Sequence, residues 1–270
     1  MLILAVDTSG KNGSLALVRA EDFDLTSAKG RQMWGTQQNE PTSAKIPTQA
    51  KSGLEWGTQI EWGTRQFEVL ELVPLAGRMY SAQIIPELQN ALSRQNLKIA
   101  DIDAYAVAAG PGSFTGLRVG LSTVKGLSEV LHKPIAAVSV LEAAARMAGH
   151  NRSVIVALDA GRKQVFVGNY RFGDDFAVEH AQESLVAYED FFRSLYGTQA
   201  KVFSPDQAVR DAAINHSVAV TEIAALQADM FARIGYQKII AGDTTPAEVL
   251  EANYIRASDA ELFSLPKLMS

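Results

Sequence analysis

The chain opens with two short apolar runs on either side of a polar turn. The runs are LILAVD (residues 2–7) and GSLALVR (13–19), and the turn between them reads TSGKN. Apolar runs of this length around glycine and asparagine are typical of a β-hairpin. The stretch SVIVALDAGRKQVFVGNYRF (153–172) repeats this order of apolar strand, aspartate, glycine turn and apolar strand. The repeat indicates a duplicated architecture.

Strand-like and helix-like patterns alternate along the rest of the chain. Apolar runs predict strands at 67–73, 103–110, 134–139 and 200–204. Helical spacing predicts helices over 80–94, from the glycine-rich loop to about 131, and over 140–148, 188–197 and 220–235. Pro86 must either kink the first helix or lie in its first turn. We therefore expect an α/β fold of two lobes with mixed sheets flanked by helices, divided into residues 1–137 and 138–270.

The segment of residues 26–66 departs from this pattern. TSAKGRQMWGTQ (26–37) and TQAKSGLEWGTQ (48–59) match at seven of twelve positions, and the segment holds all three tryptophans but few aliphatic residues. It has too little apolar surface to build a core of its own. It is either a tolerated surface insertion at a hairpin tip or a tryptophan-bearing arm that meets a partner or RNA.

Composition limits the function classes. The 270 residues carry a net charge of −5, which argues against a basic nucleic-acid-binding surface over the whole chain. The chain has no cysteine, which excludes a disulfide, a thiolate nucleophile and a zinc–thiolate site. No stretch approaches the ~18 to 20 apolar residues of a transmembrane helix, so we expect a cytoplasmic protein without membrane contact.

A glycine-rich loop, GPGSFTGLRVG (110–120), follows one predicted strand and opens a helix. Its spacing is not that of a Walker loop, and it is one residue longer than the dinucleotide fingerprint. Two interpretations remain open: an anion site at the helix N-terminus, with Ser113 or Thr115 as the N-cap, or a tight turn that packs closely on the sheet. Arg118 is opposed by the helix dipole, so we expect an acidic or anionic partner for it.

Two glycines follow within the helix itself. Gly120 and Gly126 each cost ~1 kcal/mol relative to alanine in a helix interior. A helix that retains both is suited to close approach by another backbone, in the same chain or in a second one.

Five segments together resemble a known family. They are AVDTSGKNGSLAL, GPGSFTGLRVGLSTVKGL, KPIAAVSVLEAAA, ALDAGRKQVFVGNY and the late EANYIR, in that order. They are similar to the TsaB (YeaZ) family of tRNA threonylcarbamoyladenosine biosynthesis. The resemblance implies the actin-like, sugar-kinase-like (ASKHA) fold of two similar lobes. It also implies a non-catalytic scaffold and dimerisation subunit, paralogous to the TsaD transferase, that supports synthesis of N6-threonylcarbamoyladenosine beside the tRNA anticodon.

The resemblance further implies the partners. They are a TsaD-type transferase and a TsaE-type ATPase, with a possible homodimer and with tRNA reached only through the complex. The residues agree with a non-catalytic role, because no two of the four histidines lie closer than 18 positions and a local H-x-x-x-H metal site is excluded. We predict no catalytic residue, no metal ligand and no cofactor.

Two sets of candidate site residues follow from the motifs and the resemblance. In actin-like folds the first hairpin of each lobe holds phosphates. The resemblance therefore implies a remnant nucleotide site, with the residues Asp7, Thr8, Ser9, Gly110, Gly112, Ser113 and Asp159. The alternative is that each aspartate only stabilises its own turn. The runner-up function is accordingly a nucleotide-dependent phosphotransferase or ATPase. The second set is an interface on the helices of residues 79–94 and 116–131, namely Tyr80, Gln83, Gly116, Arg118, Gly120 and Thr123.

Overall fold

The computed structural model describes residues 1–21, 66–75, 79–149, 153–173 and 177–255. Met1–Ala20 and Phe67–Ser270 belong to one compact unit. Residues 26–65 of the polar duplication lie outside the described residues, so both interpretations of that segment stay predictions.

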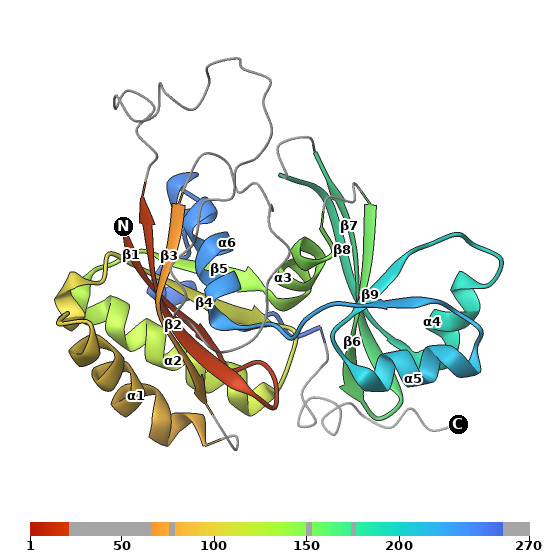
Figure 1. Ribbon diagram of the computed structural model, residues 1–270, viewed down its shortest axis with the longest axis horizontal. Helices are drawn as coiled ribbons and strands as arrows, with labels where there is room; N and C mark the ends of the chain where they lie inside the picture. The colour runs from red at the N-terminus through yellow and green to blue at the C-terminus, as the bar shows by residue number, and fades with distance from the viewer. Residues whose placement is uncertain (22–65, 76–78, 150–152, 174–176, 256–270) are drawn as a thin grey trace, which may run out of the picture. The chain divides into compact units, whose positions relative to one another are not determined.

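The first sheet has the strand order β3-β2-β1-β4-β5 (Figure 1). Strands β1 and β2 are antiparallel, whereas β4 runs parallel to β1 and β5 runs parallel to β4. The elements of this half are β1 (Leu2–Asp7), β2 (Gly13–Glu21), β3 (Gln66–Leu75), α1 (Tyr80–Arg94), η2 (Ile99–Asp101), β4 (Ala104–Gly110), α2 (Phe114–Leu131) and β5 (Ile135–Ser139).

The second sheet has the order β10-β9-β6-β7-β8. It also mixes antiparallel pairs, β6 with β7 and β7 with β8, with parallel pairs, β6 with β9 and β9 with β10. The remaining elements are α3 (Val140–Met147), β6 (Ser153–Gly161), β7 (Gln164–Phe172), β8 (Val178–Ala187), α4 (Tyr188–Leu195), β9 (Val202–Ser204), α5 (Gln207–Asn215), β10 (Val220–Glu222), α6 (Ala228–Ile240) and η3 (Ala247–Val249).

Helices cover both faces of the first sheet. Helices α1 and α2 lie side by side on one face, and α6 packs on β1, β4 and β5 from the other (Figure 1). A Cβ atom on Gly235 of α6 would lie only 2.5 Å from the Cβ of Ala106 in β4, so the helix approaches the sheet very closely. Strands β1 and β4 are buried along their whole length, which explains why they read as continuous apolar runs.

The fold class of two mixed sheets flanked by helices is confirmed, as are both predicted hairpins and the strands β3, β4 and β5. Pro86 is the seventh residue of α1 and lies inside the helix, not in its first turn. One helix prediction is wrong in its bounds. The range 220–235 contains the short strand β10, because Val220–Glu222 pairs with β9, and α6 begins only at Ala228. Tertiary pairing overrides the helical spacing there.

The chain returns to the first sheet near its end. Helix α6 packs on that sheet although the division at 137/138 assigns it to the C-terminal half of the chain. That boundary falls inside β5, and its place in the sequence carries no information about which sheet a later helix covers.

Candidate functional site

The turn of the first hairpin is closed by Asp7. The carboxylate oxygen Oδ1 accepts hydrogen bonds from the Ser9 backbone N–H at 2.9 Å and from the Ser9 hydroxyl at 2.6 Å. The side chain is buried, and this burial raises the pKa of Asp7 against the lowering effect of the two Ser9 hydrogen bonds. This is the Asx-turn arrangement, in which an aspartate stabilises its own backbone.

The glycine-rich loop packs directly onto this turn. The Ser113 N–H donates to the Ser9 carbonyl at 2.7 Å, and the Thr8 hydroxyl donates to the Gly116 carbonyl at 2.7 Å. A Cβ atom would lie 2.5 Å from the Ser9 carbonyl oxygen at Gly112, and 2.0 Å from the Thr8 carbonyl oxygen at Gly116. Backbone contact therefore accounts for these glycines without a bound phosphate, and the phosphate-binding role of the loop stays a prediction.

The start of α2 is set by the same loop. Ser113 is the N-cap, and its hydroxyl accepts the Gly116 N–H at 3.3 Å. Gly110 has φ +115°, in the region that favours glycine, and a Cβ atom there would lie 2.8 Å from the Asn253 carbonyl oxygen. The motif is thus enclosed by the first hairpin on one side and by a late segment of the chain on the other.

The second hairpin turn repeats the Asx arrangement. Asp159 accepts the Gly161 N–H at 2.9 Å and the Tyr188 hydroxyl at 3.0 Å, and its own N–H donates to Asp206 at 2.7 Å. Burial raises the pKa of Asp206, as does the negative charge of Asp159, whereas the hydrogen bond from the Asp159 backbone, Arg210 and Lys11 of the first hairpin turn lower it. Within the part of the chain that the structure describes, no hydrogen bond joins Asp7 to Asp159, and no group of three or more histidines or carboxylates there could hold a metal ion.

Three of the six predicted interface residues pack inside the lobe of their own chain. Tyr80 is buried and its hydroxyl donates to the Gly10 carbonyl at 2.9 Å. Gly116 packs on Thr8, and a Cβ atom on Gly120 would lie 2.4 Å from the Thr8 hydroxyl oxygen. These glycines allow α2 to approach the first hairpin of its own chain closely, which explains them without a second chain, and their interface role stays a prediction.

The other mid-helix glycine faces outwards. Gly126 has nothing within 4 Å of its Cβ position. It belongs to a stripe of α2 formed by Val119, Thr123, Gly126 and Val130, spaced as one helix face. We call these four residues the α2 stripe. Val130 is 76% exposed, and Thr123, which is half-buried, donates to the Val119 carbonyl at 2.9 Å. Helix α2 contacts α1, on which Gln83 is half-buried and Ile85 is exposed.

Arg118 finds aromatic rings instead of the expected acidic or anionic partner. Its guanidinium carbon lies 3.8 Å from the centre of the Phe114 ring, and its Nε donates to the Tyr254 hydroxyl at 3.0 Å. The Phe114 and Tyr254 ring centres are 4.7 Å apart. Within the described residues no carboxylate pairs with Arg118. A cation over two rings is stabilised by their quadrupoles, which offsets its unfavourable place near the N-terminus of α2. We call Phe114, Arg118 and Tyr254 the Arg118 cluster.

Sequence reasoning missed the residues that join the late segment to the loop. The Asn253 N–H donates to the Ala109 carbonyl at 2.7 Å, and Tyr254 completes the Arg118 cluster. Both lie in the EANYIR segment, whose similarity to the family was a signal that it meets another part of the fold. The contribution of Glu183, which accepts a hydrogen bond from Asn253, had no signal in the sequence.

The burial of Asp7 leads to a pH-dependent prediction. The pKa of Asp7 is 3.8 in the unfolded chain and is raised in the folded state. Asp7 therefore contributes to stability at pH values below 3.8, and this contribution is lost as the pH rises through the pKa of the folded state. We expect Asp7→Asn, which retains an acceptor for both Ser9 hydrogen bonds, to exceed the wild type in free energy of unfolding at pH 7 and to lose this advantage towards pH 4. Chemical denaturation at several pH values measures the difference.

The control is Asp190→Asn, because Asp190 is largely exposed and its substitution should be nearly neutral across the same range. A less stable Asp7→Asn variant at pH 7 would show instead that the folded protein holds Asp7 ionised.

Among the described residues, no helix combines the length and the apolar character needed to cross a membrane.

Known proteins share sequence similarity with this chain. The sequence model of the family described as "TsaD: tRNA N6-adenosine threonylcarbamoyltransferase" matches residues 73–250, which is more than half of the chain. The tRNA threonylcarbamoyladenosine biosynthesis protein TsaB of Bacillus subtilis is 30% identical over 128 residues, covering 47% of this chain and 56% of the relative. TsaB of Escherichia coli is 33% identical over 114 residues, covering 41% and 48%. The chain thus spans about half the length of these curated relatives.

A solved structure supports the fold independently. YeaZ from Pseudomonas aeruginosa aligns with a TM-score of 0.60 at 21% identity, covering 94% of this chain and 99% of that one. This likeness, with the two mixed sheets, confirms the actin-like two-lobe fold. The resemblance to TsaB (YeaZ) is confirmed as well, and the chain belongs to the TsaD family of tRNA N6-adenosine threonylcarbamoyltransferase proteins.

Proposed function

We propose that this protein takes part in the biosynthesis of threonylcarbamoyladenosine in tRNA as a non-catalytic scaffold subunit. In this role it pairs with a TsaD-type transferase, a TsaE-type ATPase joins the pair, and tRNA is reached through the complex. The names of the TsaB relatives support a place for this protein in threonylcarbamoyladenosine biosynthesis. The buried Asx-turn arrangement of Asp7 supports a structural role for the first hairpin rather than a phosphotransfer role.

The observation that carries the scaffold proposal is the α2 stripe. Val130 is exposed although it is apolar, and the space above Gly126 is open. A glycine in a helix interior is costly, and close approach by a partner helix would offset that cost. The contact surface of the proposal is therefore the α2 stripe together with the exposed Ile85 of the neighbouring helix α1. The same surface is available for a homodimer when the transferase is absent.

Gly126→Leu tests this surface. We expect the variant to fold as the wild type does, because the added side chain meets open space, and to bind a purified TsaD-type transferase more weakly. Overpacking of an interface costs ~1 to 3 kcal/mol, or about one to two decades in the dissociation constant. Titration calorimetry measures the affinity, sedimentation measures any homodimer, and a melting curve confirms folding.

The matched control is Asn215→Leu, which adds the same side chain at an exposed position of α5. It should leave transferase binding unchanged. Equal affinity of Gly126→Leu and the wild type for the transferase would remove the α2 stripe from the interface. ATP turnover by the purified wild type that disappears in Asp7→Ala would instead support the nucleotide-dependent phosphotransferase or ATPase.

A further inference from the structure

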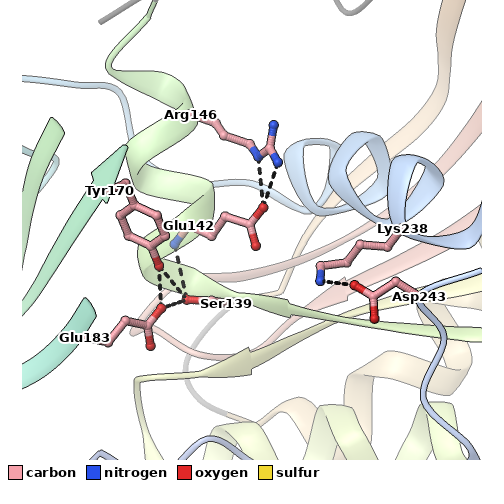
Figure 2. Close-up of polar contacts among 7 residues, drawn as sticks. All are labelled: Ser139, Glu142, Arg146, Tyr170, Glu183, Lys238 and Asp243. Carbon is pink, nitrogen blue, oxygen red and sulfur yellow. Dashed lines mark hydrogen bonds and ion pairs between the residues drawn. The ribbon is translucent and has the colours of Figure 1, made fainter. Parts of the chain in front are cut away.

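One carboxylate of the second sheet joins three separate elements. Glu183 lies on β8 and is half-buried. Its Oε1 accepts hydrogen bonds from the Ser139 hydroxyl and from the Tyr170 hydroxyl (Figure 2). Its Oε2 accepts the side-chain amide of Asn253 at 2.9 Å. Within the described residues Glu183 forms no ion pair, so neutral donors alone satisfy this charge.

Two of these donors are held firmly in place. Ser139 ends β5 and is the N-cap of α3, where its hydroxyl also accepts the Glu142 N–H at 3.2 Å. Tyr170 is buried on β7, and burial together with the charge of Glu183 raises the pKa of its hydroxyl, so it stays protonated as a donor. Two donors other than Asn253 thus hold the carboxylate of Glu183 in position.

Asn253 is held differently. Its side chain is exposed, and among the described residues that side chain hydrogen-bonds only to Glu183. Its backbone lies against the glycine-rich loop, with its N–H on the Ala109 carbonyl and its carbonyl oxygen against Gly110. The next residue is Tyr254, whose ring and hydroxyl contact Phe114 and Arg118.

We propose that Glu183 is a positioning residue that, through Asn253, fixes the late segment on the glycine-rich loop and so sets the shape of the exposed Arg118 cluster. The second sheet thereby controls a surface at the start of α2 to which it contributes no residue. The path consists of the Glu183–Asn253 hydrogen bond, the covalent link from Asn253 to Tyr254, and the contacts of Tyr254 with Phe114 and Arg118. This proposal concerns the isolated chain and does not depend on the identity of its partner.

Asn253→Asp is the direct test, because it places a second carboxylate opposite Glu183. At pH 7 the two like charges repel, so we expect hydrogen exchange of the amides of residues 253–254 and 114–118 to accelerate about threefold to tenfold over the wild type.

The double variant Glu183→Gln with Asn253→Asp reverses donor and acceptor. The glutamine amide can donate to the new carboxylate while its carbonyl oxygen still accepts from Ser139 and Tyr170. We expect wild-type exchange rates at pH 7 from this double variant. Glu179→Gln, an exposed position of the same strand, is the control and should change none of these amides.

All variants are compared as the full chain by hydrogen exchange with mass spectrometry. The positioning role is overturned if Asn253→Asp exchanges like Glu179→Gln at pH 7, or if the double variant exchanges no more slowly than Asn253→Asp. A thermal melt accompanies each sample. A general loss of stability would accelerate exchange across all strands, and that result also counts against a local positioning role.

Discussion

Gly116→Ala is expected to destabilise the protein by about 3 kcal/mol or more. The added methyl group would lie 2.0 Å from the Thr8 carbonyl oxygen, and a backbone atom cannot move aside as the end of a flexible side chain can. Relief requires α2 to shift away from the first hairpin, which would break the Thr8–Gly116 hydrogen bond of 2.7 Å. Overpacking in a close contact typically costs ~1 to 3 kcal/mol, and a backbone clash lies at or above the upper end of that range.

Gly126→Ala is the matched control, because Gly126 lies on the same helix but has no close neighbour. Its methyl group meets open space, so the gain in helix propensity should stabilise the protein by ~1 kcal/mol. Urea unfolding of both variants measures the change in the free energy of unfolding, which should have opposite signs in the two. If Gly116→Ala were as stable as the wild type, the packing of the glycine-rich loop on the first hairpin would be wrong.

Phe192→Ala should strongly destabilise the protein, with an expected cost of ~3 to 5 kcal/mol. Phe192 is 1% exposed, and its ring lies 5.1 Å from the rings of both Phe191 and His216. The buried cluster around it is small, and it comprises Ala157, Val165, Val167, Phe191, Phe192, Val202, Val209 and Ala213. Loss of its largest members leaves a cavity that the few neighbours cannot fill.

Tyr196→Ala is the control for Phe192→Ala. Tyr196 follows the same helix but is 84% exposed, so its replacement should alter the free energy of unfolding by no more than ~0.5 kcal/mol. Denaturation followed by circular dichroism compares the two variants. Similar stabilities for both would show that α4 does not pack on the second sheet through Phe192.

The two mid-helix glycines illustrate the limit of sequence reasoning. Each breaks the helical preference by the same amount, so the sequence marks Gly120 and Gly126 equally and suggests one explanation for both. In the fold, Gly120 faces Thr8 and Val6 of its own lobe, whereas Gly126 faces open space. The rotation of α2 about its axis decides between them, and this rotation depends on contacts with β1 that are more than a hundred residues distant in sequence.

Local patterns determined the elements of this protein. Apolar runs around the turns at Asp7 and Asp159 were enough for both hairpins, because strand formation there depends on neighbours a few residues away. The order of the quoted motifs was enough for the family. The sequence also marked Asp7 as a turn aspartate among its alternatives, and the hydrogen bonds to Ser9 agree with that reading.

Only the tertiary structure decided which surfaces remain free. The burial of Tyr80, the aromatic partners of Arg118 and the return of α6 to the first sheet all depend on long-range packing. The hydrogen bond from Asn253 to Glu183 joins residues 70 positions apart. No local propensity encodes such a pair, because its geometry exists only after both sheets and the late segment have folded.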